Sequence, residues 1–246
     1  MKITIFGYGV VGQALHSIIN PNTYLQIVDP IHFKDCEIEP TDIAFICVSA
    51  NNFKDDSQDI TNIIDVLKKS KSYLNVIKST ILPENVDYLI ELFPDKNIIV
   101  NPEFLTEIDS FDTAKNEKIC VIGADRYCDA QLLIEFYKTC NVKYEKFEVC
   151  KPNEAMLFKY IRNCFGALKV TFWNIINQKY NTRKVAKIFN EYERLNPQGL
   201  MSTIALDGKP GFGGKCFPKD MKAFNKVLNS DVFTEILDFN SKIRDE

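Results

Sequence analysis

The sequence predicts an α/β protein: a doubly wound, mostly parallel sheet, followed by an all-helical region with one long central helix. Three observations lead to this prediction. Short apolar runs of strand length recur up to about Cys150, helical patterns lie between them, and a glycine cluster directly follows the first run. Beyond Cys150 only helical patterns remain. We therefore expect two domains, residues 1–150 and 151–246.

The predicted strands are continuous apolar runs, which are typical of strands buried on both faces of a sheet. Helical patterns and short connections between such strands indicate βαβ units, and hence parallel pairing. The predicted strands are Ile3–Phe6, Leu25–Val28, Ile43–Val48, Val76–Lys78, Ile98–Val100 and Lys118–Ile122.

The predicted helices follow the spacing of one apolar face. Ile60, Ile63, Ile64 and Leu67 fit the i, i+3, i+4, i+7 rule. The stretch 153–178 has no proline and one glycine, which predicts a long helix. Its apolar stripe is Leu157, Ile161, Phe165, Leu168, Phe172 and Ile175. Further helical patterns cover Arg183–Arg194, Met221–Leu228 and Val232–Ile243.

The helical region is too thin to bury this long helix by itself. We therefore expect the stripe to form a homodimer interface. Packing of the stripe on its own domain is the alternative that stays open.

The composition is that of an ordinary globular protein, with 46% hydrophobic and 26% charged residues. A net charge of −3 argues against a nucleic-acid surface, and no apolar run approaches the roughly 20 residues that span a membrane. The N-terminus lacks a signal-peptide pattern. The eight cysteines form no Cys-x-x-Cys pair and there are two histidines, so we expect no metal site and a reducing, cytoplasmic location.

The glycine cluster has the pattern of a Rossmann-like dinucleotide site. Gly7 permits the tight turn, Gly9 lets the backbone approach a pyrophosphate, and Gly12 lets the helix pack on the strand. Asp29 ends the second strand, where a carboxylate binds ribose hydroxyls and repels the 2′-phosphate of NADP; this favours NAD. A glycine turn without a ligand is the alternative. The predicted contacts are Gly7, Tyr8, Gly9, Val10, Val11, Gly12 and Asp29.

A second motif, GKPGFGGKCFPKD at 208–220, places a cysteine after a glycine-rich loop. The pattern does not fit a phosphate-binding P-loop. Pro218 is favoured in the first turn of a helix, so Cys216 would lie at a helix N-terminus between Lys215 and Lys219. A thiol in that environment has a lowered pKa and acts as a nucleophile. A structural cysteine is the alternative at this stage.

Together these segments resemble the UDP-glucose/GDP-mannose dehydrogenase family of nucleotide-sugar dehydrogenases. The resemblance covers nearly the whole chain, and the cysteine loop is its most specific part. The matching segments are Gly7–Gly12 with Asp29, Lys78–Pro83, Asn101–Leu105 with Glu107, Glu154 with Lys159 and Asn163, Arg194, Gly211–Asp220, and Ile236 with Asn240 and Arg244.

The resemblance implies a four-electron oxidation of a sugar CH2OH to a carboxylate with two NAD, in polysaccharide biosynthesis. It makes Cys216 the nucleophile that forms a thiohemiacetal and then a thioester. Lys159 would stabilise the oxyanion with Asn163 beside it, since residues i and i+4 share a helix face. Glu103 would activate the hydrolytic water, and the assisting residues would be Thr80 and Asp220.

The resemblance also implies contacts to a nucleotide-sugar substrate. Arg194 resembles an arginine that reaches the substrate of a neighbouring subunit. The implied substrate contacts are Glu103, Phe104, Leu105, Glu107, Lys159, Asn163, Arg194, Phe212 and Gly213. The implied further cofactor contacts are Val48, Ser49 and Thr80.

The sequence departs from the family's pattern at its end. Family members carry a further C-terminal domain that binds the nucleotide half of the substrate, and this sequence lacks it after Glu246. A short gene, a truncated chain and a domain supplied by another chain are all compatible with this. Two other functions therefore stay open: a non-catalytic NAD-binding homologue, and a dehydrogenase of a smaller hydroxy acid or phosphate that does not need the cysteine.

Overall fold

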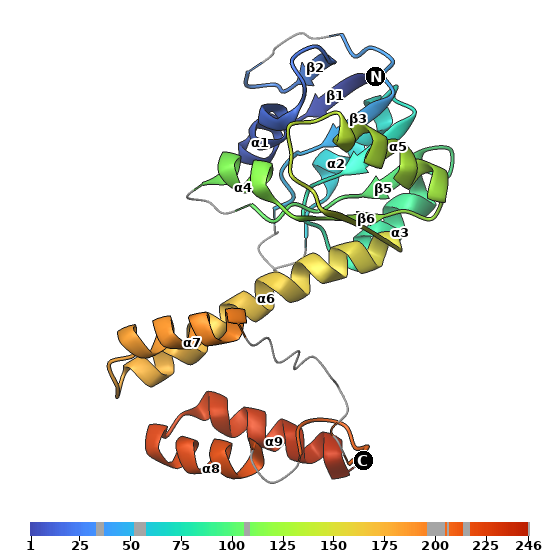
Figure 1. Ribbon diagram of the computed structural model, residues 1–246. Helices are drawn as coiled ribbons and strands as arrows, with labels where there is room; N and C mark the ends of the chain where they lie inside the picture. Colours follow the sequence, from blue (N-terminus) through green and yellow to red (C-terminus); the bar gives the residue numbers. More distant parts are fainter. Residues whose placement is uncertain are drawn as a thin grey trace. The chain divides into compact units, whose positions relative to one another are not determined.

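The computed structural model describes residues 1–32, 37–51, 58–105, 109–195, 205, 207–213 and 217–245. These residues belong to two compact units, Met1–Asn163 and Cys164–Glu246, each of which is described by itself. The long helix α6, Pro152–Asn177, begins in the first unit and ends in the second (Figure 1).

The first unit contains a seven-stranded sheet with the order β2-β1-β3-β4-β5-β6-β7 (Figure 1). All neighbouring strands pair in parallel except β5 and β6, which are antiparallel. The predicted α/β class with a mostly parallel sheet is therefore confirmed. The strands are β1 Lys2–Phe6, β2 Tyr24–Val28, β3 Ile43–Ile46, β4 Leu74–Ile77, β5 Asn97–Val100, β6 Ile119–Gly123 and β7 Lys146–Cys150.

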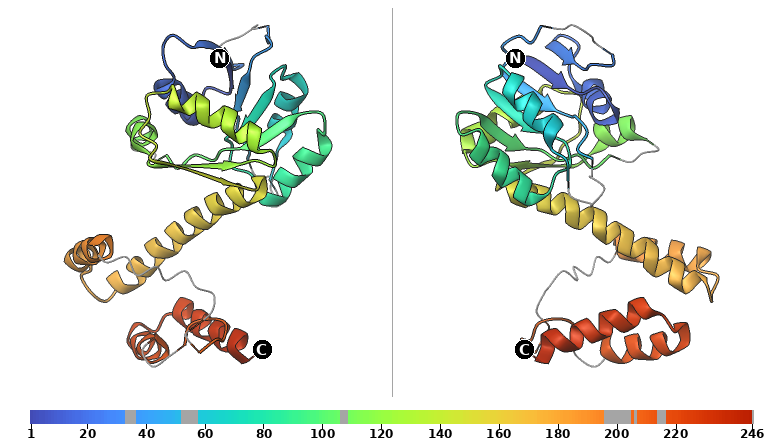
Figure 2. Two further views of the ribbon diagram at one scale, coloured as in Figure 1. Left: turned by 45° about the vertical axis from the view of Figure 1, so that its right-hand side comes forward. Right: turned by 180° about the vertical axis from the view of Figure 1, so that it is seen from behind.

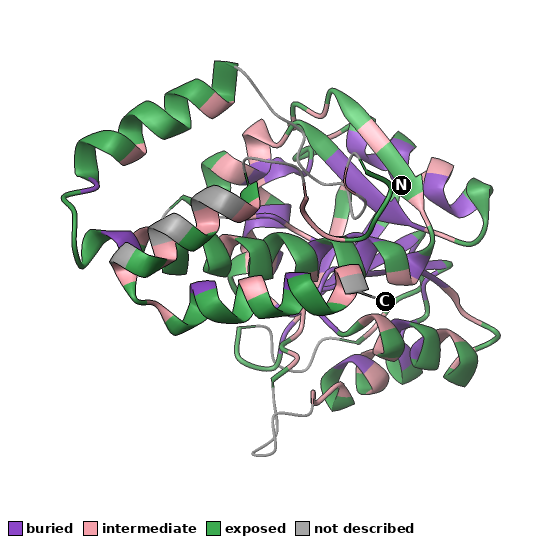
Figure 3. Ribbon diagram, turned by 90° about the horizontal axis from the view of Figure 1, so that it is seen from below, coloured by how far each residue is buried: buried purple, intermediate pink, exposed green. Residues whose placement is uncertain are grey.

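The helices of the first unit cover both faces of the sheet, as the two further views show (Figure 2). The first hydrophobic core cluster packs Ile3 and Ile5 of β1 against Leu15 and Leu133. The second packs Ile46 of β3 against the helices on the other face of the sheet. These buried residues lie in the strands and on the inner faces of the helices (Figure 3). The helices are α1 Val10–Ile18, α2 Thr61–Lys69, α3 Pro83–Leu92, α4 Ser110–Asn116 and α5 Tyr127–Lys138.

The strand β7 was not predicted from the sequence. It pairs with β6 along its whole length, from Ile119 opposite Lys146 to Gly123 opposite Cys150. As the last strand of the sheet it has no fully buried residue, and Val149 is 40% exposed. A search for continuous apolar runs misses such an edge strand, because its polar residues face solvent.

The second unit contains the end of α6 and the helices α7 Arg183–Leu195, α8 Phe217–Leu228 and α9 Asp231–Asp245. Aromatic rings connect α6 to α9 and to α7: Phe172 stacks on Phe233 at 5.8 Å between centroids, and Trp173 meets Phe189 edge-on at 5.5 Å. Among the described residues, no helix is both long and apolar enough to cross a bilayer.

Candidate cofactor and active site

The glycine turn after β1 has backbone geometry that only glycine satisfies at two of its positions. Gly7 has φ +88°, in the left-handed region, and an added Cβ would lie 2.8 Å from the carbonyl oxygen of Cys47. A Cβ at Gly12 would lie 2.2 Å from the carbonyl oxygen of Gly7. At Gly9, by contrast, a Cβ would meet no atom within 4 Å. The absence of a side chain at Gly9 therefore leaves space open outside the turn, as close approach of a pyrophosphate requires.

Asp29, directly after β2, is tied to this turn. Its Oδ2 accepts a hydrogen bond from the backbone N–H of Tyr8 at 2.8 Å, and its Oδ1 accepts from those of Ile31 and His32 at 2.9 and 3.0 Å. Burial raises the pKa of the Asp29 carboxyl, but these hydrogen bonds outweigh it and lower the pKa to about 2. The carboxylate is therefore negatively charged throughout the physiological range.

A cleft of about 870 Å³ opens beside the turn, within the range of ligand-binding clefts. It lies at the carboxyl ends of the parallel strands, where α/β sheets bind nucleotides. The structure brings ten predicted residues together around it: Gly7, Tyr8, Gly9, Val10, Val11, Asp29, Val48, Ser49, Thr80 and Glu103. Gly12 instead packs beneath the turn.

Lys159 and Glu103, far apart in the sequence, meet in the first unit. The Lys159 Nζ donates to Glu103 Oε1 at 3.0 Å, and the backbone N–H of Leu105 donates to Glu103 Oε2 at 2.6 Å. The Lys159 ammonium also lies 5.4 Å from the centroid of the Phe104 ring. Lys159 is 5% exposed, and Glu103 lines the large cleft. A buried cation next to a carboxylate at the edge of a cleft can stabilise a developing oxyanion and move a proton.

A buried polar network supports the loop that carries Glu103, and sequence reasoning assigned it no role. The Lys78 Nζ donates to the backbone oxygen and Oδ1 of Asn101 at 3.0 and 2.9 Å. The Tyr137 hydroxyl donates to the same Oδ1 at 2.6 Å, and Asn101 Nδ2 donates to the oxygen of Val121 at 2.7 Å. Burial lowers the pKa of the Lys78 ammonium. The sequence signal was present, since Lys78 and Asn101 begin two of the quoted segments.

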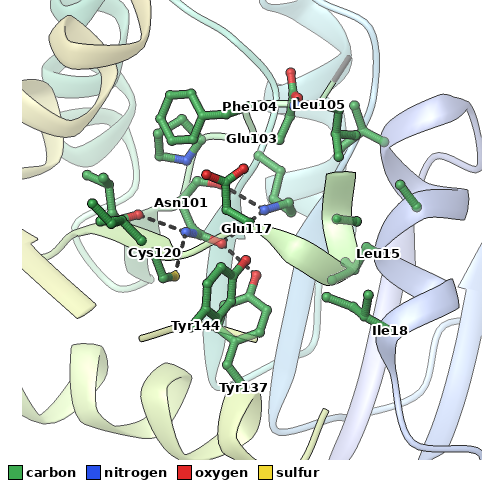
Figure 4. Close-up of a pocket in the computed structure, with 17 residues that line it drawn as sticks. Leu15, Ile18, Asn101, Glu103, Phe104, Leu105, Glu117, Cys120, Tyr137 and Tyr144 are labelled. Atoms are coloured by element: carbon green, nitrogen blue, oxygen red, sulfur yellow. Dashed lines mark hydrogen bonds between the residues drawn. The ribbon is translucent and has the colours of Figure 1, made fainter. Parts of the chain in front are cut away.

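This network lines a small cavity of about 40 Å³ below the loop (Figure 4). Asn101 lies at its centre in the close-up, with hydrogen bonds toward Cys120 and Tyr137. Glu117 also lines the cavity, and burial raises the pKa of its carboxyl while the Arg162 charge lowers it. The cavity is large enough for ordered water but not for a substrate.

Within the second unit, the glycine-rich loop is fastened to α9. The Phe212 N–H donates to Asn240 Oδ1 at 2.7 Å, and Asn240 Nδ2 donates to the Phe212 oxygen at 3.1 Å. A Cβ at Gly213 would lie 2.7 Å from Nη1 of Arg244, which donates to the Pro210 oxygen at 3.3 Å. These contacts fasten the described part of the loop to α9.

Of the other predicted site residues, Arg194, Phe212, Gly213 and Asp220 belong to the second unit, and Asn163 is the last residue of the first. Asn163, one turn beyond Lys159, is exposed. Arg194 pairs with Glu191 on its own helix at 2.7 Å. Asp220 lies in α8, but its side chain is outside the described atoms. The remaining two, Cys216 and Glu107, lie outside the described residues, so their place in the site stays a prediction.

Comparison with known families decides the relationship. The profile of the UDP-glucose/GDP-mannose dehydrogenase family, central domain, matches residues 153–243, and that of the family's NAD binding domain matches residues 31–141. The chain belongs to this family. The predicted resemblance is thereby confirmed.

Named relatives support the assignment. The chain is 28% identical over 218 residues to the UDP-glucose 6-dehydrogenase of Rickettsia bellii, covering 84% of this chain and 50% of that protein. It is 26% identical over 205 residues to the UDP-glucose 6-dehydrogenase TuaD of Bacillus subtilis, covering 78% of this chain and 44% of that protein. The chain thus spans about half the length of these relatives.

Solved structures share the fold. A ternary complex of GDP-mannose dehydrogenase from Pseudomonas aeruginosa superposes with a TM-score of 0.76 at 22% identity, covering 99% of this chain and 69% of that chain. The UDP-D-ManNAc dehydrogenase of Pyrococcus horikoshii has a TM-score of 0.60 at 17% identity, with the same two coverages.

The cofactor is NAD, as the family's NAD binding domain indicates. The described residues fit it, because the open space at Gly9 admits a pyrophosphate and the charged Asp29 disfavours a 2′-phosphate. Bound NAD would supply a hydride acceptor. Among the described residues, no group of three His, Cys, Asp or Glu side chains could hold a metal ion.

Proposed function

We propose that the chain is an NAD-dependent nucleotide-sugar dehydrogenase, similar to UDP-glucose 6-dehydrogenase, that oxidises a sugar CH2OH to a carboxylate. The observation that carries this proposal is the pair formed by Lys159 and Glu103. Glu103 belongs to the same cleft as the glycine turn, so the pair lies beside the space for a dinucleotide. Relatives that the chain matches over about half of their length are named UDP-glucose 6-dehydrogenase.

In this proposal Lys159 stabilises negative charge on the substrate oxygen, assisted by Asn163 on the same helix. Glu103 receives a proton and later orients the water that hydrolyses the thioester, with Thr80 and Asp220 assisting. Cys216 is the nucleophile: its sulfur adds to the aldehyde carbon to form a thiohemiacetal, whose oxidation to a thioester precedes release of the carboxylate. The substrate would contact Phe104, Leu105, Glu107, Arg194, Phe212 and Gly213.

The proposed organisation is a domain for NAD, residues 1–150, and a helical domain, residues 151–246, that joins two subunits. The predicted stripe of α6 supports the homodimer, since Leu157, Ile161 and Phe165 are 48, 56 and 49% exposed in the single chain. A second copy of the same helix would cover these apolar side chains.

The test is formation of reduced cofactor with UDP-glucose, GDP-mannose and UDP-ManNAc. We expect turnover with one of them, its loss in Cys216→Ala and Lys159→Met, and its retention in Lys169→Met, a matched change of an exposed lysine on the same helix. Mass spectrometry of the peptide that contains Cys216 would detect the trapped thioester. NAD binding without turnover on any sugar nucleotide would indicate a non-catalytic homologue, and activity that survives Cys216→Ala would indicate a smaller substrate.

A further inference from the structure

The side-chain amide of Gln58, just before α2, is held by four hydrogen bonds. Its Nε2 donates to the backbone oxygen of Thr80 and to the hydroxyl of Tyr160, both at 3.1 Å. Its Oε1 accepts from the backbone N–H of Leu82 at 2.8 Å and from Asn85 Nδ2 at 3.0 Å. An amide offers two donors and two acceptor positions, so all of them are used. Because a backbone N–H only donates, Leu82 also fixes which end of the amide is the oxygen.

The two groups that accept from Gln58 belong to segments of the first unit that are remote in the sequence. Thr80 lies in the loop between β4 and α3, and it lines the cofactor cleft. Tyr160 lies on α6, 102 residues from Gln58, and directly follows Lys159. Gln58 therefore connects the loop that borders the cleft to the turn of α6 that carries the buried lysine.

We propose that Gln58 is a positioning residue that sets the loop of Thr80 at a fixed place relative to Lys159. The inference rests on the dehydrogenase activity proposed above, in which both groups serve one substrate. Thr80 and Glu103 line the same cleft, and Glu103 is paired with Lys159. A displacement of about 1 Å between such groups lowers a rate by up to about 100-fold. Gln58 is not among the described residues that line the cleft, so it acts through Thr80 rather than on the substrate.

The same connection predicts a response of α6 to the cofactor. A dinucleotide that fills the cleft restrains the loop at Thr80, and the loop restrains Tyr160 through Gln58. Ordering one end of such a connection makes local opening at the other end rarer, which hydrogen exchange detects. NAD is therefore expected to slow amide exchange in the turn of α6 around Tyr160.

Two substitutions break the connection, one at each end. Gln58→Glu keeps the acceptor oxygen of the side chain but places a second oxygen against the Thr80 carbonyl, which it repels. Tyr160→Phe removes only the hydroxyl, so it leaves the Thr80 contact and the charge of the site unchanged. Asn153→Ala is the matched control, because it breaks another contact of α6, to α3 at 3.1 Å, that does not involve the loop.

The experiment measures turnover of NAD with UDP-glucose, GDP-mannose and UDP-ManNAc, and hydrogen–deuterium exchange with and without NAD. Gln58→Glu and Tyr160→Phe are each expected to lower kcat about 5- to 50-fold and to change the KM of NAD less than about threefold, since the glycine turn is untouched. The double variant should be about as slow as either single one, because a connection broken at one end no longer transmits. NAD should slow exchange around Tyr160 at least about twofold in the unmodified chain and in Asn153→Ala, but not in the other variants.

An unchanged kcat in both Gln58→Glu and Tyr160→Phe would overturn the proposal, as would an equal loss of kcat in Asn153→Ala. A response of α6 to NAD that is absent from the unmodified chain, or equally large in Gln58→Glu, would also overturn it. If the unmodified chain oxidises none of the three sugar nucleotides, the proposed function fails, and the exchange measurement alone decides the role of Gln58. Tyr160→Phe carries the test if Gln58→Glu does not fold, since it deletes a single hydroxyl.

Discussion

Replacement of Gly9 and Gly12 by alanine separates what the turn does for the fold from what it does for the ligand. Both substitutions add one methyl group to the same turn. At Gly12 the new Cβ would lie 2.2 Å from the backbone oxygen of Gly7, which cannot rotate away. At Gly9 the Cβ would meet no atom within 4 Å, and the backbone at φ −74°, ψ −162° is accessible to alanine.

The expected stability changes follow from these distances. Overpacking against fixed backbone costs about 3 kcal/mol for Gly12→Ala, and the better helix propensity of alanine offsets about 1 kcal/mol of that. The net loss of about 2 kcal/mol corresponds to a Tm decrease of about 4–8 °C for a protein of this size. Gly9→Ala should change the free energy of unfolding by less than about 0.5 kcal/mol, because the lost cap preference and the gained backbone restriction are of similar size.

Binding should show the opposite order. Gly9→Ala places a methyl group where the pyrophosphate approaches, so we expect at least a tenfold increase in the Kd of NAD while the fold is retained. Thermal unfolding followed by circular dichroism, together with calorimetric titration of NAD, measures both quantities. The reasoning is refuted if Gly12→Ala is as stable as the unmodified protein, or if Gly9→Ala binds NAD with unchanged affinity.

Three further predictions concern groups that the fold buries. Folding lowers the pKa of the Lys78 ammonium below its ordinary value of 10.5. Between the two pKa values the unfolded chain binds more protons than the folded chain, so the free energy of unfolding rises as pH rises toward 10.5. Lys78→Met should lack this rise, and the difference between the urea midpoints of the two proteins measures it. Folding lowers the pKa of the Asp29 carboxyl to about 2, so its contribution of about 1–2 kcal/mol to stability is present above about pH 4 and is lost as pH falls toward 2. Asp29→Asn should therefore lose less stability on acidification. An identical loss of stability in the two proteins over this pH range would contradict the prediction. Asn240→Ala removes the acceptor of the Phe212 N–H and should speed its hydrogen exchange at least tenfold, whereas Asn225→Ala, which breaks a contact to Thr234 elsewhere on α9, should not.

Much of the first unit could be predicted from local sequence, because a buried parallel strand must be apolar on both faces. The core strands β1, β3 and β4 are of this kind, and the glycine pattern located the turn that the structure shows at Gly7. The edge strand β7 was not predicted, because a half-exposed strand has no continuous apolar run. The predicted catalytic cysteine and second acid, Cys216 and Glu107, lie outside the described residues and stay predictions.

The sequence by itself determined the fold class, the family and the cofactor, because turn chemistry and strand burial are encoded over a few adjacent residues. Only the tertiary structure decided which distant side chains meet. It placed Lys159 on Glu103, fixed Lys78 beneath Asn101, and set His32 on Asp29. No local sequence pattern encodes such pairings, because they depend on how the strands and α6 pack. The residues next to a lysine or histidine in the sequence do not indicate whether its side chain faces solvent or a carboxylate.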